Sequence, residues 1–223
     1  MKLSVIIPVY NEADTIGETL ARVRRVELDK EIIVVDDCSD DGTRELLEKE
    51  SGIKLICHER NMGKGMAIRT ALRYAIGDVV IIQDADLEYD PQDFHLMLGP
   101  IERGEADVVY GSRFLGRRPG MRLANYIANR ILAAVASLLF GARISDEATC
   151  YKAFRTEVIR AIHLTCRRFE FCPEVTAKLL RKGVRIIEAP IHYTARSSAR
   201  GKKISWWDGV VALWTLIKFR LVR

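Results

Sequence analysis

Residues 79–86 read Val79-Val80-Ile81-Ile82-Gln83-Asp84-Ala85-Asp86. An apolar run that ends in turn residues predicts a buried strand of a parallel sheet. Side chains two positions apart share one face, so Asp84 and Asp86 leave the strand together at its carboxyl end, where open α/β sheets bind ligands. Paired carboxylates suit Mg²⁺ or Mn²⁺, and Glu88 offers a third oxygen donor. The alternative interpretation is that these acids only end a strand and begin a loop.

Outward from this stretch, apolar runs and amphipathic segments alternate over the first 115 residues. We predict strands at 3–8, 32–36, 54–58, 79–83 and 107–110, and helices at 13–26, 43–50, 64–75 and 91–101. This alternation predicts an α/β fold with a mostly parallel sheet flanked by helices. Beyond residue 120 we expect helices at 121–140, 156–163, 173–181 and 206–221, and strands at 152–154 and 184–189.

The composition of the 223 residues fits one globular domain, since 48% of them are hydrophobic. The net charge of +5 is uneven, because residues 196–223 hold seven Lys or Arg against one Asp. A near-neutral body with a basic tail predicts an anionic partner for the tail. The basic stretch is short and lacks a known binding module, so we expect no nucleic acid. Five cysteines without a Cys-x-x-Cys pair favour a reducing compartment over disulfides or a zinc site.

The tail also suggests a membrane surface. Segment 204–222 combines three tryptophans, an apolar centre and basic flanks, which is typical of an interfacial helix. Segment 121–140 is either a second interfacial helix or a core helix. We expect no signal peptide, because the first apolar run is too short, and no transmembrane helix, because no run of about 20 apolar residues is uninterrupted. The chain thus divides into a body, 1–195, and a basic loop with an amphipathic helix, 196–223.

Further polar motifs follow the other predicted strands. They are Pro8-Val9-Tyr10-Asn11-Glu12, Asp36-Asp37-Cys38-Ser39, Asn61-Met62-Gly63-Lys64-Gly65 and Gly111-Ser112-Arg113. Each alone has a plainer interpretation as a turn, a helix start or a surface ion pair. Neither Gly-x-Gly-x-x-Gly nor a Walker A sequence occurs. Together the motifs place functional side chains at the carboxyl ends of five successive strands, which is what a nucleotide-sugar site needs.

The order and spacing of these motifs resemble family 2 glycosyltransferases, and within them the polyprenyl-phosphate (dolichyl-phosphate) mannose or glucose synthases. Later segments extend the resemblance over roughly the whole chain, namely Asp146, 149–152, 169–171, 173–178 and 201–203. The resemblance implies a GT-A fold, a nucleotide-diphosphate-sugar donor and Mg²⁺ or Mn²⁺. The chain departs from the pattern at Glu88, Cys38 and Cys172, where Gln, Gly and Glu, respectively, are common.

The resemblance also implies roles for individual residues. The nucleotide sugar would be held by Pro8, Tyr10, Glu12, Asp37, Lys64, Asp84, Ala85 and Asp86. Catalysis would rest on Asp84, Asp86 and Arg113, with Asp86 and Glu88 as metal ligands. The acceptor phosphate would be held by Arg113 and Arg122. We expect the loop with Arg196, Arg200, Lys202 and Lys203 to form a basic lid over the donor diphosphate and the lipid phosphate.

The expected function is metal-dependent, inverting transfer of a hexose to a polyprenyl or dolichyl monophosphate at the cytoplasmic membrane face, as in protein glycosylation. Mannose from GDP-mannose is favoured. The enzyme would be peripheral, with room for a membrane-anchoring partner. Alternatives are glucose from UDP-glucose to the same lipid, a saccharide acceptor and, outside enzymes, a membrane-docking subunit with a relic nucleotide pocket.

Overall fold

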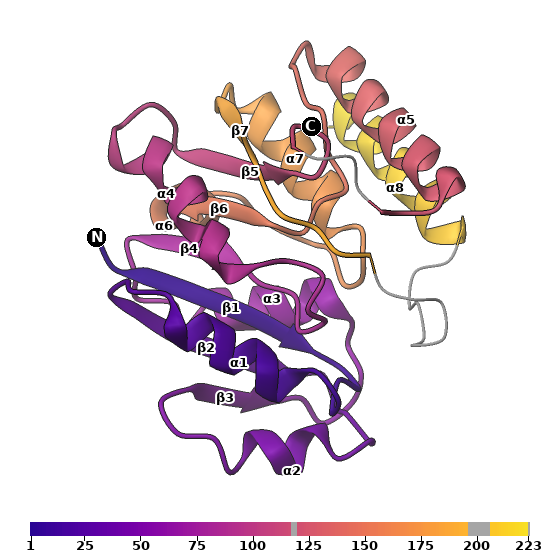
Figure 1. The fold of residues 1–223 in the computed structure, drawn as a ribbon. Coiled ribbons are helices and arrows are strands. Elements are labelled where there is room, and N and C mark those ends of the chain that lie inside the picture. The colour runs from indigo at the N-terminus through magenta and orange to yellow at the C-terminus, as the bar shows by residue number, and fades with distance from the viewer. Residues whose placement is uncertain (117–119, 196–205, 223) are drawn as a thin grey trace.

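The computed structural model describes residues 1–116, 120–195 and 206–222. Its centre is a seven-stranded sheet in the order β3-β2-β1-β4-β6-β5-β7 (Figure 1). The strands are β1 (Leu3–Val9), β2 (Lys30–Asp36), β3 (Lys54–Cys57), β4 (Val79–Ile82), β5 (Val108–Ser112), β6 (Lys152–Arg155) and β7 (Ile186–Pro190).

The sheet is mostly parallel, as the sequence predicts. β1 pairs in parallel with β2 and β4, β2 with β3, and β5 with β7. Only β6 is reversed, and it lies between β4 and β5. The carboxyl ends of the parallel strands therefore meet at one edge of the sheet. Every residue of β4 is buried, which explains why its sequence is continuously apolar.

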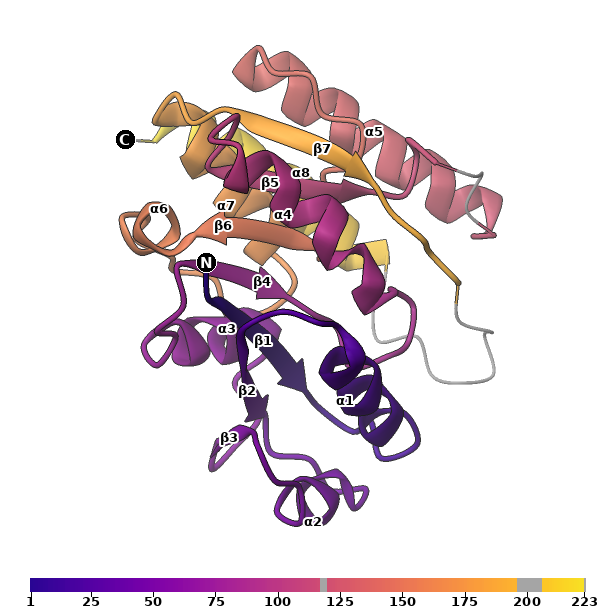
Figure 2. The ribbon, with the colours of Figure 1, turned by 60° about the vertical axis from the view of Figure 1, so that its left-hand side comes forward.

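Helices cover both faces of the sheet (Figures 1 and 2). On one face, α1 (Ile16–Arg25) and α4 (Phe94–Glu102), which follows the 3₁₀ turn η1 (Pro91–Asp93), enclose an apolar cluster, to which the short α2 (Thr43–Leu47) adds Leu47. On the other face, α3 (Lys64–Leu72), α6 (Thr156–Arg160) and α7 (Phe171–Arg181) enclose a second cluster.

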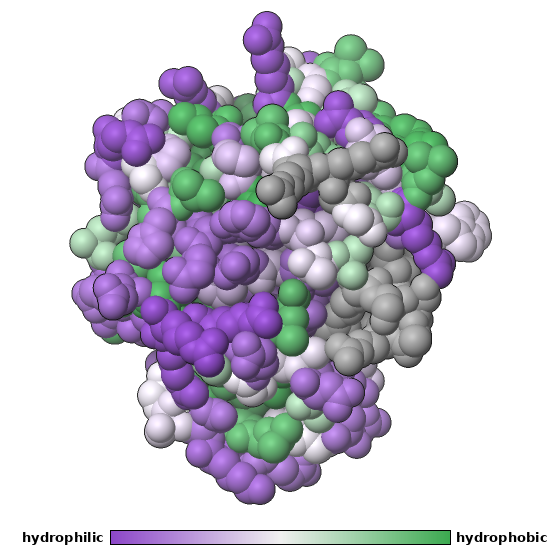
Figure 3. Space-filling model, in the orientation of Figure 1, coloured by the Kyte–Doolittle hydropathy of each residue, from purple (hydrophilic) through white to green (hydrophobic). Residues whose placement is uncertain are grey.

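Two further helices, α5 (Leu123–Phe140) and α8 (Trp206–Leu221), lie side by side and pack on α7 (Figures 1 and 2). Their shared core consists of Leu132, Ala136, Ala177, Ala212 and Leu216. Their remaining surface keeps large apolar side chains exposed, among them Leu123, Ile127, Ile131, Leu138, Trp206, Trp207, Val210, Trp214 and Leu221. Figure 3 shows part of this surface as a green strip over α5, at the upper right.

Helix α5 is long and apolar enough to cross a membrane, judged by length and composition alone. It has 18 residues, and Asn125, Asn129 and Arg130 interrupt its apolar positions, so it does not form the uninterrupted run of about 20 apolar residues on which the expectation rests, and the absence of a transmembrane helix stays a prediction. The core helix of a soluble protein can meet the same two criteria, and α5 packs on α7 and α8 through one face.

Several predicted boundaries move by a few residues. The helix predicted at 13–26 begins at Ile16, because Thr15 N donates to Glu12 O at 3.0 Å and closes a turn first. The helix predicted at 173–181 begins at Phe171, which places Pro173 in the first turn, where its missing N–H is not needed. The segment predicted at 91–101 divides into η1 and α4.

Candidate active site

A pocket of about 440 Å³ opens at the carboxyl ends of the parallel strands. It is lined by every predicted site residue that the structure describes: Pro8, Tyr10, Glu12, Asp37, Lys64, Asp84, Ala85, Asp86, Glu88, Arg113 and Arg122. The predicted lid residues Arg196, Arg200, Lys202 and Lys203 lie outside the described residues. The sequence therefore located the pocket wall, and the individual roles of these side chains stay predictions.

The loop after β1 is tied to the loop after β2. Asn11, at a φ of 51°, donates from Nδ2 to Asp40 Oδ1 at 2.7 Å and accepts from Asp40 N at 3.0 Å. Glu12 accepts from Thr15 Oγ1 at 2.8 Å. These bonds hold two strand-end loops together and fix the pocket wall that carries Tyr10 and Glu12.

Asp37 lines the pocket, but its carboxylate also organises the protein behind it. It accepts from the backbone N–H groups of Met62 at 2.8 Å and Gly63 at 2.7 Å, and it contacts His58 Nδ1 at 2.7 Å. These three contacts fix the glycine turn that precedes Lys64. Asp37 therefore positions the neighbouring turn, and its predicted contact with a nucleoside would be a second role.

Lys64 forms an ion pair with Asp84 inside the pocket, and its ammonium lies 3.0 Å from Cys150 Sγ. Burial lowers the pKa of Lys64, but Asp84 and Cys150 together raise it more, so that the net pKa lies well above the ordinary value. Lys64 is thus a fixed positive charge. A fixed cation on the floor of a pocket favours anionic ligands such as a diphosphate.

Behind Lys64 two thiols face each other. Cys150 Sγ lies 3.9 Å from Cys172 Sγ, and Cys172 is within 3.4 Å of Thr149 O. The hydrogen bond between the two sulfurs lowers the pKa of Cys172 and raises the pKa of Cys150. Cys150 therefore holds its proton more tightly than an isolated thiol would, and Cys172 releases its proton more readily.

Asp86 and Glu88 stand on a tight turn, in which Leu87 has a φ of 62° and Glu88 N donates to Asp86 Oδ1 at 3.1 Å. Tyr193 lies beside them and forms a side-chain hydrogen bond with Glu88. Burial, together with the negative charge of Glu88, raises the pKa of the Tyr193 hydroxyl above its usual range. This keeps Tyr193 a neutral hydrogen-bond donor beside two acids.

These acids fit a divalent metal that shares its ligands with a substrate. Among the described residues, no three His, Cys, Asp or Glu side chains form a complete metal cage. Mg²⁺ is usually bound by one or two carboxylates together with substrate phosphates and water. Asp86 and Glu88 line the same pocket as Lys64, so both would meet a metal-diphosphate ligand there.

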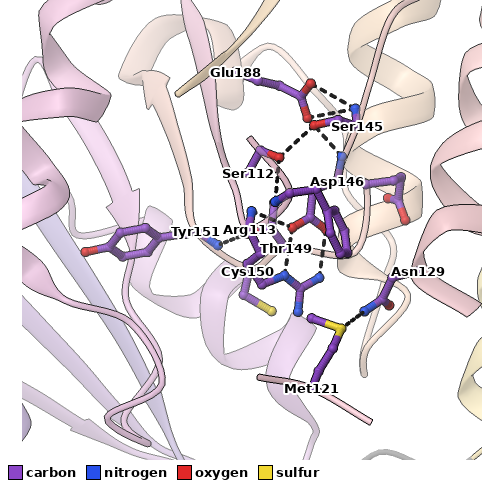
Figure 4. Close-up of polar contacts among 12 residues, drawn as sticks. Ser112, Arg113, Met121, Asn129, Ser145, Asp146, Thr149, Cys150, Tyr151 and Glu188 are labelled. Carbon is purple, nitrogen blue, oxygen red and sulfur yellow. Dashed lines mark hydrogen bonds and ion pairs between the residues drawn. The ribbon is translucent and has the colours of Figure 1, made fainter. Parts of the chain in front are cut away.

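Arg113 is held by a carboxylate from another segment (Figure 4). Asp146 accepts from Arg113 Nε and Nη2, each at 2.7 Å, and from Arg113 N at 3.0 Å. Burial lowers the pKa of Arg113, whereas Tyr89 and Asp146 raise it, and the net pKa lies well above the ordinary value. The predicted acceptor-phosphate arginine is therefore charged, buried and aligned by Asp146.

A second carboxylate supports the first. Glu188, on β7, accepts from Ser145 N at 2.9 and 2.8 Å and from Asp146 N at 2.9 Å (Figure 4). Ser112 Oγ, next to Arg113, lies 2.6 Å from Ser145 Oγ. Residues that are distant in sequence thus form one chain of hydrogen bonds from β7 to the guanidinium. Sequence reasoning missed Glu188, because nothing local distinguishes it from an ordinary strand residue.

Sequence reasoning also missed the aromatic part of the pocket wall. Tyr89 stacks on Tyr151 with ring centroids 4.9 Å apart, and Tyr193 tilts against Tyr89 at 5.7 Å. Tyr193 also lies under the Arg113 guanidinium, at 5.3 Å. Tyr89 follows the acidic motif by three residues, and this proximity is the only signal that could have pointed to it.

Arg168 and Phe169 complete the wall beside Lys64. They belong there because the first turn of α3 bonds to their segment: Gly65 N donates to Arg168 O and Met66 N to Arg167 O, both at 3.0 Å. This close approach requires glycine, since a Cβ at Gly65 would lie 2.9 Å from Arg168 O.

Comparison with known proteins points to one enzyme family. The profile of Glycosyl transferase family 2 matches residues 4–162. The chain is 28% identical to the undecaprenyl-phosphate mannosyltransferase of Micrococcus luteus, over 99% of each chain. It is 29% identical to the dolichol-phosphate mannosyltransferase of Pyrococcus furiosus, over 100% of this chain and 68% of that protein.

The fold is also similar to solved structures. The glucosyl-3-phosphoglycerate synthase of Mycobacterium tuberculosis, in complex with Mn²⁺, UDP and glucosyl-3-phosphoglycerate, superposes with a TM-score of 0.75 and 19% identity. The match covers 99% of this chain and 78% of that one. At this identity the likeness concerns the fold, which is the GT-A arrangement of sheet and helices.

Proposed function

The chain is a member of glycosyltransferase family 2, and from this premise we propose that it transfers a hexose from a nucleotide sugar to a polyprenyl or dolichyl monophosphate. One observation carries the proposal: acids, a lysine and an arginine from different strand ends line a single pocket. The names of the two mannosyltransferase relatives support a lipid phosphate as the acceptor.

The donor would occupy the side of the pocket formed by the loops after β1, β2 and β4. Tyr10 offers a ring to the base, and Glu12 offers an acceptor to the base or the ribose. Lys64 lines the same pocket, and its ammonium would meet the diphosphate. Asp84, which pairs with Lys64, would face the sugar and the diphosphate.

Asp86 and Glu88 would hold Mg²⁺ or Mn²⁺. When bound, such a metal neutralises charge on the leaving diphosphate. Glu88 adds a negative charge at this end of the pocket, and Tyr193 donates to it. The protein thus contributes acids, and the donor would complete the coordination sphere.

The acceptor phosphate would lie against Arg113, which Asp146 holds in a fixed orientation. Arg122 lines the same pocket and would form a second contact. A phosphate monoester is already ionised near neutral pH, because its second pKa is about 6. The acceptor therefore needs positioning but no general base. Direct displacement would invert the anomeric centre.

We favour mannose from GDP-mannose as the donor, since both named relatives are mannosyltransferases. Glucose from UDP-glucose is the alternative. The enzyme would act as a peripheral protein at the cytoplasmic face, because α5 and α8 expose large apolar side chains on a chain with a basic tail. A membrane-anchoring partner would be compatible with the same surface.

A transfer assay tests this function. The full chain is incubated with Mn²⁺ or Mg²⁺ and labelled GDP-mannose or UDP-glucose in parallel, and with undecaprenyl phosphate, dolichyl phosphate or a mixture of soluble saccharides as the acceptor. Label that enters an organic-extractable, acid-labile product with one donor supports the proposal and identifies the sugar. Label transferred only to soluble saccharides would favour the saccharide acceptor. Absence of nucleotide binding would favour a docking subunit with a relic pocket.

Asp86→Asn tests the site itself. We expect it to reduce kcat by roughly 100-fold or more, because a group that stabilises charge in the transition state is lost. Asp84→Asn should have a similar effect through the loss of its pair with Lys64. Mn²⁺ binding, followed by electron paramagnetic resonance with GDP present, should weaken in Asp86→Asn. Glu105→Gln, in an exposed ion pair with Arg103, is the control. Wild-type activity in both site variants would rule out this pocket.

A further inference from the structure

Two cysteines meet at the inner end of the pocket. Cys150 precedes β6 and Cys172 lies in the first turn of α7, yet their sulfurs are 3.9 Å apart. All five cysteines of the chain are free thiols. Cys150 is partly exposed and lines the pocket, whereas Cys172 is 6% exposed and lies behind it. The pocket is therefore a route by which a small molecule can reach the first sulfur.

The surroundings of Cys150 favour reaction at its sulfur. Cys150 is the sulfur that lines the pocket, and the Lys64 ammonium, 3.0 Å from it, stabilises negative charge that forms there. The contact between the two sulfurs raises the pKa of Cys150 and lowers the pKa of Cys172, so Cys172 can accept the Cys150 proton as Cys150 reacts. Cys172 is placed to react next, because the Cys150 sulfur is within its contact distance. A partly accessible thiol with a second thiol behind it is the arrangement of reversible redox sites.

We propose that Cys150 and Cys172 form a redox modification site, in which a small hydroperoxide converts the two thiols into a disulfide and weakens nucleotide binding in the pocket. Cys150 gives its proton to Cys172 and its sulfur attacks one peroxide oxygen; the O–O bond breaks, the proton passes to the leaving oxygen, and a sulfenic acid and an alcohol (or water) form. Cys172 then attacks the Cys150 sulfur, the S–S bond forms and water leaves. Overall, two thiols are oxidised and one hydroperoxide is reduced.

The disulfide changes the pocket because the sulfurs must approach. Their separation has to fall from 3.9 Å to about 2.05 Å. Cys150 then moves toward Cys172, and its contact with the Lys64 ammonium is strained or lost. Lys64 is the cation that would meet the donor diphosphate. The effect on nucleotide binding rests on the proposed function, whereas the formation of the disulfide does not.

Peptide mapping tests the disulfide directly. Reduced, desalted full-length protein is treated with hydrogen peroxide, alkylated with iodoacetamide and digested with trypsin. Each cysteine falls in a different tryptic peptide, and Cys150 and Cys172 lie in 144–152 and 169–178. We expect a linked pair of these two peptides that disappears on treatment with dithiothreitol. Oxidation confined to Cys38 or Cys57, without the linked pair, would overturn the proposal.

Matched variants test the assignment. Cys172→Ser should abolish the linked pair and let Cys150 proceed to sulfinic acid, which dithiothreitol does not reverse. Cys57→Ser removes an exposed thiol and should leave the linked pair intact. A linked pair that involves Cys166 in place of Cys172 would contradict the geometry.

Calorimetry with GDP and UDP, in the presence of Mn²⁺, tests the consequence. We expect Kd to rise at least tenfold on oxidation of the wild type and to recover with dithiothreitol. Bound nucleotide should in turn slow formation of the linked pair. Equal affinity of the oxidised and reduced forms would overturn the effect on the pocket. If the disulfide forms but neither form binds nucleotide, the proposed function fails together with that effect, and the modification site stands.

Discussion

At the residue scale, the guanidinium of Arg113 is oriented by carboxylates arranged one behind the other. Asp146 binds it at two nitrogens, and Glu188 binds the backbone of Ser145 and Asp146. Such bidentate pairs fix direction as well as charge. Arg113 is therefore aligned before any ligand arrives, and the alignment depends on a residue on β7.

Glu188→Gln tests this dependence. The amide keeps the size of the side chain but loses the charge that strengthens its bonds to the two backbone N–H groups, at a cost of about 1–3 kcal/mol in unfolding free energy. We expect KM for the lipid phosphate to rise roughly 10- to 100-fold, because a small displacement of Arg113 misplaces the acceptor. KM for the donor should be unchanged.

Steady-state kinetics with each substrate varied in turn would check whether KM rises for the lipid phosphate alone. Glu157→Gln, on the exposed side of α6, is the control and should leave both KM values unchanged. Equal rises in both KM values for Glu188→Gln would indicate a general structural defect and contradict a positioning role.

At the element scale, the start of α3 is pressed against the segment 166–168. A Cβ at Gly63 would lie 2.4 Å from Arg167 O, and the φ of Gly63 is 90°. Lys64 follows Gly63 directly, so the position of the first turn of α3 sets the position of the Lys64 ammonium. The glycines of this motif serve backbone packing in addition to turn geometry.

Gly63→Ala and Gly42→Ala test how demanding this position is. Gly42 has a φ of 93°, but a Cβ at that position would have no neighbour within 4 Å, so its substitution adds backbone strain alone, of about 1–2 kcal/mol. Gly63→Ala adds a clash with backbone, and at φ 90° and ψ 157° it also occupies a region that only glycine readily adopts, so it should cost roughly 1–3 kcal/mol more. Urea unfolding would measure both. Similar losses in the two variants would contradict tight packing at Gly63.

The paired helices α5 and α8 give a second prediction at this scale. Trp214 is 63% exposed on α8. If this surface contacts a bilayer, Trp214→Ala should weaken binding to phosphatidylglycerol-containing vesicles roughly tenfold or more, since burial of such a side chain is worth about 1.5–3 kcal/mol. Ile76→Ser, at another exposed apolar residue, is the control. Vesicle co-sedimentation would measure both, and unchanged binding by Trp214→Ala would exclude this surface.

At the scale of the whole molecule, the sequence predicted the α/β class, the mostly parallel sheet and the strand ends that line the pocket. Local signals sufficed there, because continuous apolar runs followed by acids mark the carboxyl ends of buried strands. The signals did not reveal that β6 is inserted between β4 and β5, or that Glu188 supports Asp146. Those facts depend on pairings between residues far apart in the chain, about which local periodicity carries no information.

The stability of the whole molecule should depend on pH through Glu174. This carboxylate is 1% exposed and accepts from Thr165 N at 2.8 Å and Cys166 N at 2.6 Å. Burial raises the pKa of Glu174, but Lys178 and Thr165 lower it more, so that the net pKa lies below 4.5. A depressed pKa stabilises the fold above the unfolded value of 4.5, and the contribution is lost as pH falls through the folded value.

Unfolding of wild type and Glu174→Gln from pH 7 to pH 3 would check the sign. The wild type should be the more stable at pH 7, and the difference in unfolding free energy should shrink below pH 4.5. A difference that is constant with pH, or that grows toward pH 3, would contradict the assignment.

Strand β6 joins the part of the sheet formed by β3, β2, β1 and β4 to the part formed by β5 and β7, and it is synthesised late. β4 is complete at Ile82, but its neighbour β6 begins only at Lys152 (Figure 1). At about 5–20 residues per second, a ribosome needs roughly 4–15 s to make the intervening chain. For that time one edge of β4 keeps unpaired N–H and C=O groups, which can pair with other strands. The nascent protein therefore passes through an aggregation-prone stage that the finished enzyme does not have, and slower translation between these strands lengthens that stage.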